Sequence, residues 1–262
     1  MPSGVRQAPG SGGQARSTLQ TQIGSIRHPC ARSPRRQALP AEGVILEAGC
    51  GLGQYVLLLR ERGWRVTGVD WSLEALAACR RVAAAPLAAM QLRALAVRDG
   101  ALAGYVSLGV VEHDAAGPDA ILSEARRVLA PGGALVVSVP YVNGARRLAA
   151  PWIRRRNQAL ARNGSEFYQY AFSRAELVAT LDRHGFIVRS LRPYDSGRLL
   201  RQVLRRVLGS HGSRKRPDLA LQNSSEDEHR RGPLVGIARR LLYTEPALRL
   251  LGHMLLVVAR RA

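Results

Sequence analysis

The most constraining feature of this chain is a stretch in which two short apolar runs flank a glycine-rich turn. The first run, Val44–Leu46, is continuously apolar, which predicts a strand covered on both faces of a parallel sheet. Tyr55–Arg60 follows the turn with a helical pattern, and Val66–Val69 predicts a second strand. The turn itself contains three alternating glycines, Gly49, Gly51 and Gly53. Glycine permits a sharp turn and leaves backbone accessible to a ligand, so the stretch predicts a ligand-binding βαβ unit.

Asp70 ends the second run and suggests what the ligand contains. A carboxylate at the tip of the second strand of a βαβ unit can accept hydrogen bonds from both hydroxyls of a ribose. The free N–H groups at the start of the helix attract an anionic or strongly polar group. Gln54 stands where a dinucleotide-binding motif has its third glycine. The pattern therefore favours an adenosine-containing cofactor other than a dinucleotide.

With Glu47 in front of the glycines, the turn resembles the first motif of class I S-adenosylmethionine-dependent methyltransferases, acidic-x-Gly-x-Gly-x-Gly. The resemblance implies S-adenosylmethionine as the cofactor. It also implies an α/β fold with a doubly wound, seven-stranded, mostly parallel sheet whose last strand is antiparallel. The residues that it assigns to the cofactor are Glu47, Ala48, Gly49, Cys50, Gly51, Gly53, Asp70, Trp71, Gln91, Leu92 and Leu108.

Later segments continue the resemblance as far as Tyr141. Tyr105–Val111 predicts the fourth strand, and Ser107–His113 looks like the fourth-strand motif of the branch acting on small molecules and lipid-like substrates. A helix over Asp119–Leu129 leads to Pro-Gly-Gly, which we expect to form a tight turn before a fifth strand at Ala134–Val139. The landmarks of the family therefore fall in the expected order.

Pro86–Met90 predicts a weak third strand, and Gln91 follows it. Members of this class often place an acid there to hold the adenine amino group. The side-chain carbonyl of Gln91 can accept the same hydrogen bond without a charge.

Glu112 and His113 are the candidate catalytic residues. The carboxyl ends of parallel strands bind ligands in such sheets, so this pair is expected to border the methyl group. His113 can take a proton from a hydroxyl acceptor; alternatively, the pair shapes the pocket. We expect no metal, because Gly109 stands where another acidic ligand would be needed. The Asn-Pro-Pro-Tyr-like segment of amino-methylating enzymes is missing after the fourth strand, which favours methylation on oxygen.

Composition sets limits on partners and compartment. The 262 residues suit one α/β domain with appendages, and the formal net charge is +20, with Lys215 as the only lysine. This surplus favours anionic partners, although arginine-rich usage also fits a GC-rich genome. The three cysteines form no paired or zinc-spaced pattern, which fits a reducing compartment. No apolar run approaches the ~20 residues of a membrane span, and a cytoplasmic location is expected, with peripheral membrane contact as an addition.

The chain divides into four parts by pattern. Residues 1–41 are polar and basic, and are expected to be a disordered tail, a targeting segment or a misassigned start. Residues 42–195 form the cofactor-binding core, with strands ending in Phe186–Tyr194. Residues 196–252 form a helical, partly disordered insertion, and residues 253–262 form the last strand, predicted at His253–Ala259.

The acceptor is expected to contact the segments after the fifth strand. Tyr141–Asn163 is rich in arginine around Trp152, and Glu166–Ser173 is an aromatic cluster that suits either a lid or ordinary packing. Ser173 and Glu176 form a capping box that opens a helix. Within the insertion, Arg198–Leu208 is a basic amphipathic pattern that suits an anionic membrane surface or packing on its own domain.

The sequence thus predicts a methyltransferase that acts on a small or lipid-like, anionic acceptor. Two alternatives stay open. An RNA methyltransferase would use the positive charge for phosphate contacts. A non-catalytic relative would bind the cofactor or a partner protein and perform no chemistry.

Overall fold

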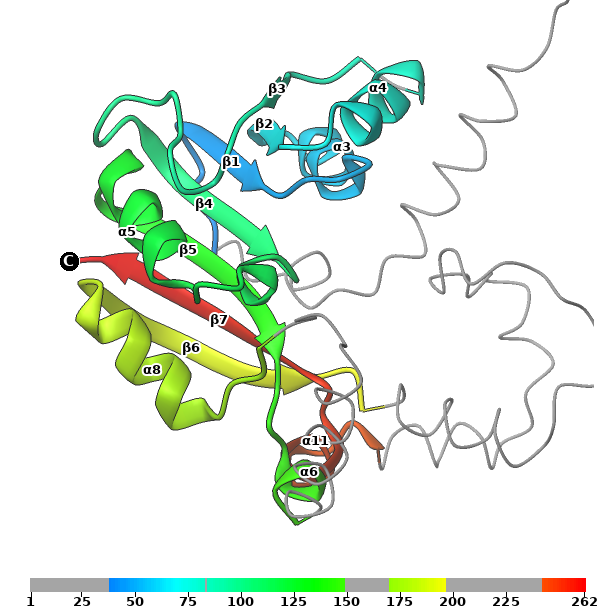
Figure 1. Ribbon diagram of the computed structural model, residues 1–262, viewed down its shortest axis with the longest axis vertical. Helices are drawn as coiled ribbons and strands as arrows, with labels where there is room; N and C mark the ends of the chain where they lie inside the picture. Colours follow the sequence, from blue (N-terminus) through cyan, green and yellow to red (C-terminus); the bar gives the residue numbers. More distant parts are fainter. Residues whose placement is uncertain (1–37, 83, 149–169, 197–241) are drawn as a thin grey trace, which may run out of the picture.

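The computed structural model describes residues 38–82, 84–148, 170–196 and 242–262 (Figure 1). These residues form one seven-stranded sheet in the order β3-β2-β1-β4-β5-β7-β6. Neighbouring strands are parallel from β3 to β5, and β7 is antiparallel to both β5 and β6. The doubly wound, mostly parallel α/β fold expected from the sequence is confirmed.

The elements have the following bounds. The strands are β1 Val44–Ala48, β2 Arg65–Asp70, β3 Leu87–Ala89, β4 Leu102–Leu108, β5 Leu129–Pro140, β6 Phe186–Tyr194 and β7 Met254–Arg261. The helices are α3 Gln54–Glu61, α4 Leu73–Val82, α5 Asp119–Val128, α6 Gly144–Leu148, α8 Arg174–Arg183 and α11 Glu245–Leu251. A short 3₁₀ turn, η1, spans Val111–His113 between β4 and α5.

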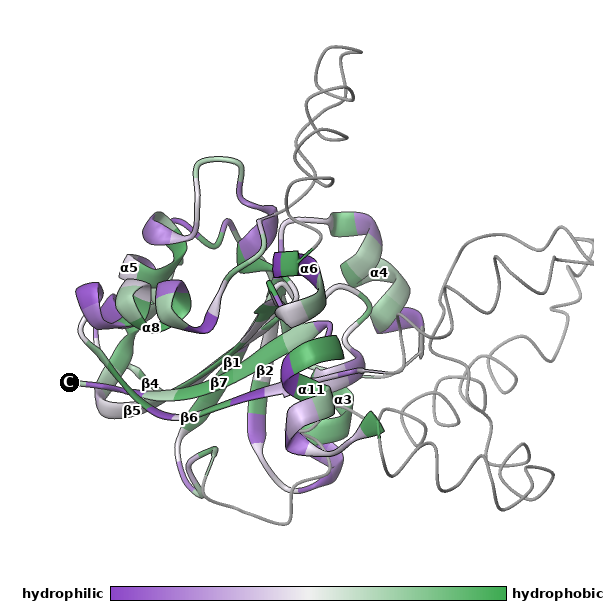
Figure 2. Cartoon of the chain, turned by 90° about the horizontal axis from the view of Figure 1, so that it is seen from below, coloured by the Kyte–Doolittle hydropathy of each residue, from purple (hydrophilic) through white to green (hydrophobic). Residues whose placement is uncertain are grey.

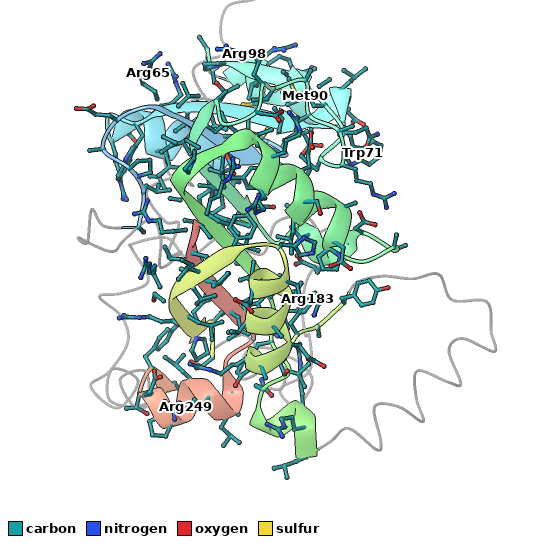
Figure 3. All side chains as sticks on the ribbon, turned by 90° about the vertical axis from the view of Figure 1, so that its left-hand side faces the viewer. Arg65, Trp71, Met90, Arg98, Arg183 and Arg249 are labelled. Carbon is teal, nitrogen blue, oxygen red and sulfur yellow. The ribbon has the colours of Figure 1, made fainter. Side chains whose placement is uncertain are left out.

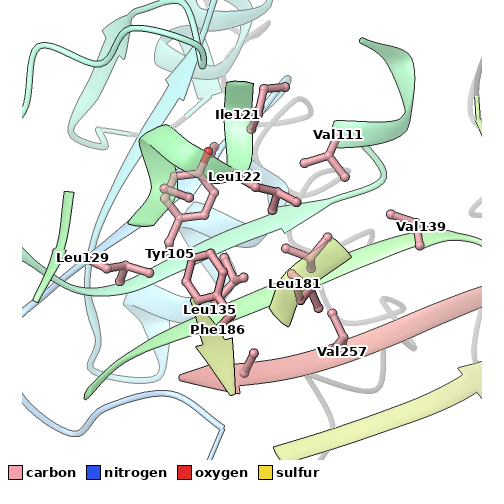
Figure 4. Packing of buried hydrophobic residues seen from close by; sticks show 14 of the residues in the cluster. Tyr105, Val111, Ile121, Leu122, Leu129, Leu135, Val139, Leu181, Phe186 and Val257 are labelled. Atoms are coloured by element: carbon pink, nitrogen blue, oxygen red, sulfur yellow. The ribbon is translucent and has the colours of Figure 1, made fainter. Parts of the chain in front are cut away.

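Helices cover both faces of the sheet, so the apolar strands are buried on each side (Figure 2). On one face, side chains of α5 and α8 pack on β4, β5 and β7; Leu122, Leu181 and Val257 belong to this cluster (Figure 4). On the other face, Val56 of α3 and Leu76 of α4 pack on β1 and β2. Two apolar layers therefore hold the strand ends in fixed positions.

The fourth strand differs from the sequence-based prediction. It runs from Leu102 to Leu108 and ends three residues before Val111. Gly109 adopts a φ of +74°, a left-handed conformation that takes the chain out of the sheet. Val111 therefore lies in η1, although its apolar side chain is still buried.

The fifth strand is longer than predicted, because the Pro-Gly-Gly segment lies inside it. β5 begins at Leu129, which pairs with Leu102 of β4, and the ladder shifts register before Gly104 pairs with Ala134. The expected tight turn is therefore an irregularity within the strand. α5 ends one residue earlier than predicted, at Val128.

The helix after the aromatic cluster begins as the sequence predicts. The Ser173 hydroxyl accepts a hydrogen bond from Glu176 N, and Ser173 N donates to Glu176 Oε2, so the capping box is complete. α11 starts at Glu245, with Pro246 in its first turn. Backbone N–H groups in the first turn form no hydrogen bond within the helix, so a proline is tolerated there. Several segments named in the sequence analysis lie outside the described residues. They are the tail over residues 1–37, Trp152, Arg198–Leu208 and most of the insertion.

Candidate functional site

The glycine-rich turn follows β1 at the carboxyl edge of the sheet. Gly49, Gly51 and Gly53 have φ values of 78°, 50° and 72°, so all three adopt left-handed conformations. Gly49 N and Cys50 N donate hydrogen bonds of 2.8 and 2.9 Å to the Val69 carbonyl, which ties the turn to β2. A Cβ added at Gly51 would meet no atom within 4 Å, so this part of the turn faces open space. The turn thus offers exposed backbone to a ligand, as expected.

Asp70, at the tip of β2, lies directly against this turn. Its Oδ2 accepts a hydrogen bond of 2.7 Å from Gly51 N, and its Oδ1 accepts one of 2.9 Å from Ser72 N. Each carboxylate oxygen can accept a second hydrogen bond. The site can therefore hold a diol such as a ribose without breaking these two bonds.

α3 begins immediately after the turn, with Gly53 as its N-cap. Gly53 supplies no side-chain hydrogen bond to the first turn of the helix. The Val56 amide interacts with Glu47, and the backbone N–H groups before it favour an anionic group such as a carboxylate. This end of the site therefore suits the amino-acid part of a cofactor.

Glu47 is buried beneath the turn, with only 3% of its surface exposed. The carboxylate interacts with the Val56 backbone amide of α3, while Oε2 has no hydrogen-bond partner. Burial, together with the nearby negative charge of Asp70, raises the pKa of Glu47 to about 8. Burial also raises the pKa of Cys50, in the turn itself, to about 12, so this thiol stays protonated.

The remaining candidates for the cofactor lie along the same edge. Ala48 is buried at the end of β1, and Leu108 is half-buried at the end of β4. Trp71, after β2, is 74% exposed and projects from the molecule (Figure 3). Gln91 is exposed just beyond β3, and Leu92 beside it is half-buried. The Met90 amide donates to the Asp70 carbonyl at 3.1 Å, which brings the Gln91 segment next to the aspartate.

The loop after β4 packs directly on the glycine-rich turn, a contact that the sequence did not indicate. A Cβ at Gly49 would lie 2.6 Å from both methyl groups of Val110. The ends of β1 and β4 therefore approach so closely that only glycine fits at position 49. The catalytic candidates follow Val110 by two and three residues, so they adjoin the turn.

Glu112 and His113 differ sharply in environment. Glu112 is 2% exposed, and its Oε2 has no hydrogen-bond partner. Burial raises the pKa of Glu112 to about 7, while the charge of neighbouring His113 opposes the rise. His113, by contrast, is an exposed residue. The pair thus combines a buried acid with an accessible imidazole.

Tyr170 holds η1 from the other side of the loop. Its backbone N donates a 2.8 Å hydrogen bond to the Glu112 carbonyl, and its hydroxyl donates one of 2.9 Å to the Ala115 carbonyl. Phe172, two residues on, forms a bridge with Tyr141 at the end of β5. The described end of the predicted aromatic cluster, from Tyr170 onward, therefore contacts the segment of the catalytic candidates.

An ion pair that sequence reasoning missed joins two loops of the site. Arg93 Nε donates a 2.6 Å hydrogen bond to Asp114 Oδ2, and the second guanidinium nitrogen contacts Oδ1. This bidentate partner lowers the pKa of Asp114 below its usual range. The loop after β3 and the loop after β4 are thereby fixed to each other. Within the described ranges, no group of three His, Cys, Asp or Glu residues could hold a metal ion.

Comparison with known proteins identifies this arrangement. Residues 46–137, which include the turn, Asp70 and η1, match the family model described as a methyltransferase domain. The chain contains a class I S-adenosylmethionine-dependent methyltransferase domain. This confirms the expectation from the glycine motif, and S-adenosylmethionine is the cofactor of such domains.

Solved structures share the fold of this methyltransferase domain. A methyltransferase from Methanosarcina mazei is 17% identical, with 86% of this chain and 94% of that chain covered and a TM-score of 0.55. One from Mesorhizobium loti is also 17% identical, with 89% and 96% covered and a TM-score of 0.53.

A curated relative matches a short segment. The S-adenosyl-L-methionine-dependent Diels-Alderase iccD of Talaromyces variabilis is 64% identical over 33 residues. The match spans 13% of this chain and only 11% of that protein. The assignment of the methyltransferase domain therefore rests on the family model and the fold, and the reaction of this relative is not used for it.

Proposed function

We propose that this protein transfers the methyl group of S-adenosylmethionine to an oxygen atom of a small or lipid-like acceptor. The observation that carries the proposal is the hydrogen bond from Gly51 N to Asp70 Oδ2, which places a carboxylate inside the glycine-rich turn. The Asp70 carboxylate offers acceptors for a ribose, and the first backbone amides of α3 offer donors for an amino-acid carboxylate. The residues present therefore fit this cofactor.

In this proposal, Asp70 binds the ribose hydroxyls and the start of α3 binds the methionine carboxylate. The turn from Ala48 to Gly53 provides the backbone surface, and Trp71, Gln91, Leu92 and Leu108 surround the adenine. The bound cofactor supplies an activated methyl group on a sulfonium, so the protein's main task is to position the acceptor. Such positioning can contribute several kcal/mol of barrier lowering.

His113 is the proposed proton acceptor for a hydroxyl group that is methylated. Its exposed ring lies beside Glu112 on η1, next to the loop that packs on Gly49. Histidine is the side chain that most often serves as a general acid or base in proton transfer. Tyr170 fixes the backbone of η1 and so keeps His113 in place.

The surface around α6 and α11 supports a lipid-like acceptor and contact with an anionic membrane. Neither helix has a buried residue, and the two lie side by side beyond the ends of β5 and β7 (Figure 1). Leu148, Tyr243 and Leu250 are 81%, 49% and 46% exposed. Arg147 and Arg249 are exposed beside them. Apolar side chains flanked by arginines suit the interface of an anionic bilayer. Among the described helices, none has the length and apolar character to cross a membrane.

Incubation with methyl-labelled S-adenosylmethionine tests the proposal. We expect the label to enter a lipid or small-molecule extract, and Asp70→Asn to reduce transfer strongly because it loses a ribose-binding oxygen. Transfer to RNA with none to the extract would establish the alternative acceptor. Cofactor binding without transfer to either would establish the non-catalytic alternative.

A further inference from the structure

Several acids of this arginine-rich protein pair with an arginine, and Glu47 differs from them. Asp99, Asp114 and Glu124 each form an ion pair with an arginine. Glu47, by contrast, has no cationic partner among the described residues, although 39 of the 262 residues are arginine or lysine. A buried carboxyl group that lacks a counter-charge stabilises a positive ligand more strongly than an exposed or paired one.

Among the described residues, the groups around Glu47 supply no positive charge. In the alternation of β1, its side chain lies on the same face as Ile45, toward α3 and α4. A Cβ at Gly53 would lie 2.4 Å from Cys79 Sγ, so the turn packs directly on α4 there. The groups that face Glu47 electrostatically are Asp70 of β2, the thiols of Cys50 and Cys79, and the Val56 amide. None of these groups carries a positive charge.

The chemistry of the cofactor makes this arrangement informative. S-adenosylmethionine carries a positive sulfonium, whereas its product S-adenosylhomocysteine has a neutral thioether at the same atom and is otherwise the same apart from the methyl group. A site that is neutral or positive would not favour the sulfonium. A negative site without a counter-ion favours it, and releases the neutral product more readily.

We propose that Glu47 distinguishes the sulfonium cofactor from the thioether product, by giving up its proton when the positive ligand binds. This inference rests on the proposed function. Burial beside Asp70 favours the protonated form of the carboxyl group when no ligand is bound. Bringing a sulfonium to the turn makes the carboxylate form favourable, and the proton leaves to the solvent. Glu47 acts here through its charge, as a specificity residue beneath the turn.

Calorimetric titration with both ligands between pH 6 and 8.5 tests the inference. Repeating each titration in buffers of different ionisation enthalpy counts the protons released. We expect S-adenosylmethionine to release up to one more proton than S-adenosylhomocysteine. Its affinity should rise with pH by at most about tenfold per pH unit, the limit for one proton. If the two ligands release the same number of protons from the wild type, the inference is overturned without any variant.

Variants separate Glu47 from other titrating groups. Glu47→Gln keeps the shape of a protonated carboxyl group but cannot ionise, so the extra proton release should disappear and the preference for the sulfonium should fall about tenfold at pH 8. Glu124→Gln removes an acid of α5 that is paired with Arg127, and should retain the extra proton release. The ligand's own amino group is present in every titration, so the comparison of each variant with the wild type removes its contribution. Loss of the effect in Glu124→Gln, or its persistence in Glu47→Gln, would overturn the inference. If neither ligand binds the folded wild type, the proposed function fails with it.

Discussion

The backbone amide of Gly51 donates a 2.7 Å hydrogen bond to the carboxylate of Asp70, nineteen residues later in the chain. This bond joins the turn after β1 to the tip of β2 and so closes the βαβ unit at its carboxyl edge. Gly51 has a φ of +50° and faces open space, so its amide is fixed while its α-carbon stays accessible. One contact therefore both shapes the turn and positions the carboxylate.

Gly49→Ala should destabilise the protein more than Gly51→Ala. Both glycines have positive φ, which costs roughly 1–2 kcal/mol for alanine. Only at Gly49 would the new methyl group also meet Val110, at 2.6 Å, and overpacking adds about 1–3 kcal/mol. Urea denaturation of both variants measures the difference. Equal free energies of unfolding would contradict the close approach of Val110.

Glu112→Gln should stabilise the protein at pH 8 and have little effect at pH 4. Burial raises the pKa of Glu112 from an ordinary value near 4.5 to about 7. Because the pKa is higher in the folded state, the folded protein binds the proton more tightly than the unfolded chain does. The free energy of unfolding therefore decreases as pH rises from about 4.5 through 7. Glutamine avoids that loss, and a gain of about 1–3 kcal/mol is expected at pH 8. A gain that is the same at both pH values would exclude this explanation.

Asp114→Asn should destabilise the protein at pH 7, and the difference should vanish in acid. Arg93 lowers the pKa of Asp114, so the ion pair stabilises the fold above the ordinary pKa of aspartate and is lost as pH falls through the lowered value. The urea midpoints of wild type and variant at pH 7 and at successive pH values down to pH 2 check the direction. A difference that stays the same over the whole range would show that the charge is not responsible.

Ser173→Ala should lower stability by about 1 kcal/mol, because it removes the hydroxyl that accepts from Glu176 N. Glu176→Gln keeps a side chain able to accept from Ser173 N and serves as the matched variant. Both should bind S-adenosylmethionine as the wild type does, since α8 lies away from the glycine-rich turn. A large loss of cofactor affinity in Ser173→Ala would contradict that separation.

The double variant Leu148→Ser, Leu250→Ser should reduce binding to vesicles that contain anionic lipid. The two leucines are exposed on α6 and α11, next to arginines that would each contribute about 1 kcal/mol at a negative surface. Ile187→Ser, on β6, changes an exposed apolar residue elsewhere and is the matched control. Co-sedimentation with vesicles measures binding. Equal loss in control and double variant would exclude a localised membrane surface.

The sequence predicted the parts of the fold that depend on local patterns. Continuous apolar runs indicated buried strands, and the capping box at Ser173 indicated the start of α8. The sequence also predicted that the glycine motif and Asp70 lie close together, because a βαβ unit brings consecutive strand ends to one edge of the sheet.

Features that depend on register and long-range packing could not be predicted. The apolar residues Val110 and Val111 continue the β4 pattern, but the left-handed conformation of Gly109 ends the strand first. The contact of Val110 with Gly49 depends on how β1 and β4 align. The ion pair of Arg93 with Asp114 joins two loops without a local signal.

The most direct test of the account is calorimetric titration of S-adenosylmethionine into the wild type and Asp70→Asn, with Asp182→Asn on the exposed end of α8 as the control. We predict micromolar binding by the wild type and the control, and at least tenfold weaker binding by Asp70→Asn, about 1.4 kcal/mol. Absence of binding by folded wild-type protein, or equal binding by Asp70→Asn, would contradict the central claim that the Gly51–Asp70 corner holds the cofactor.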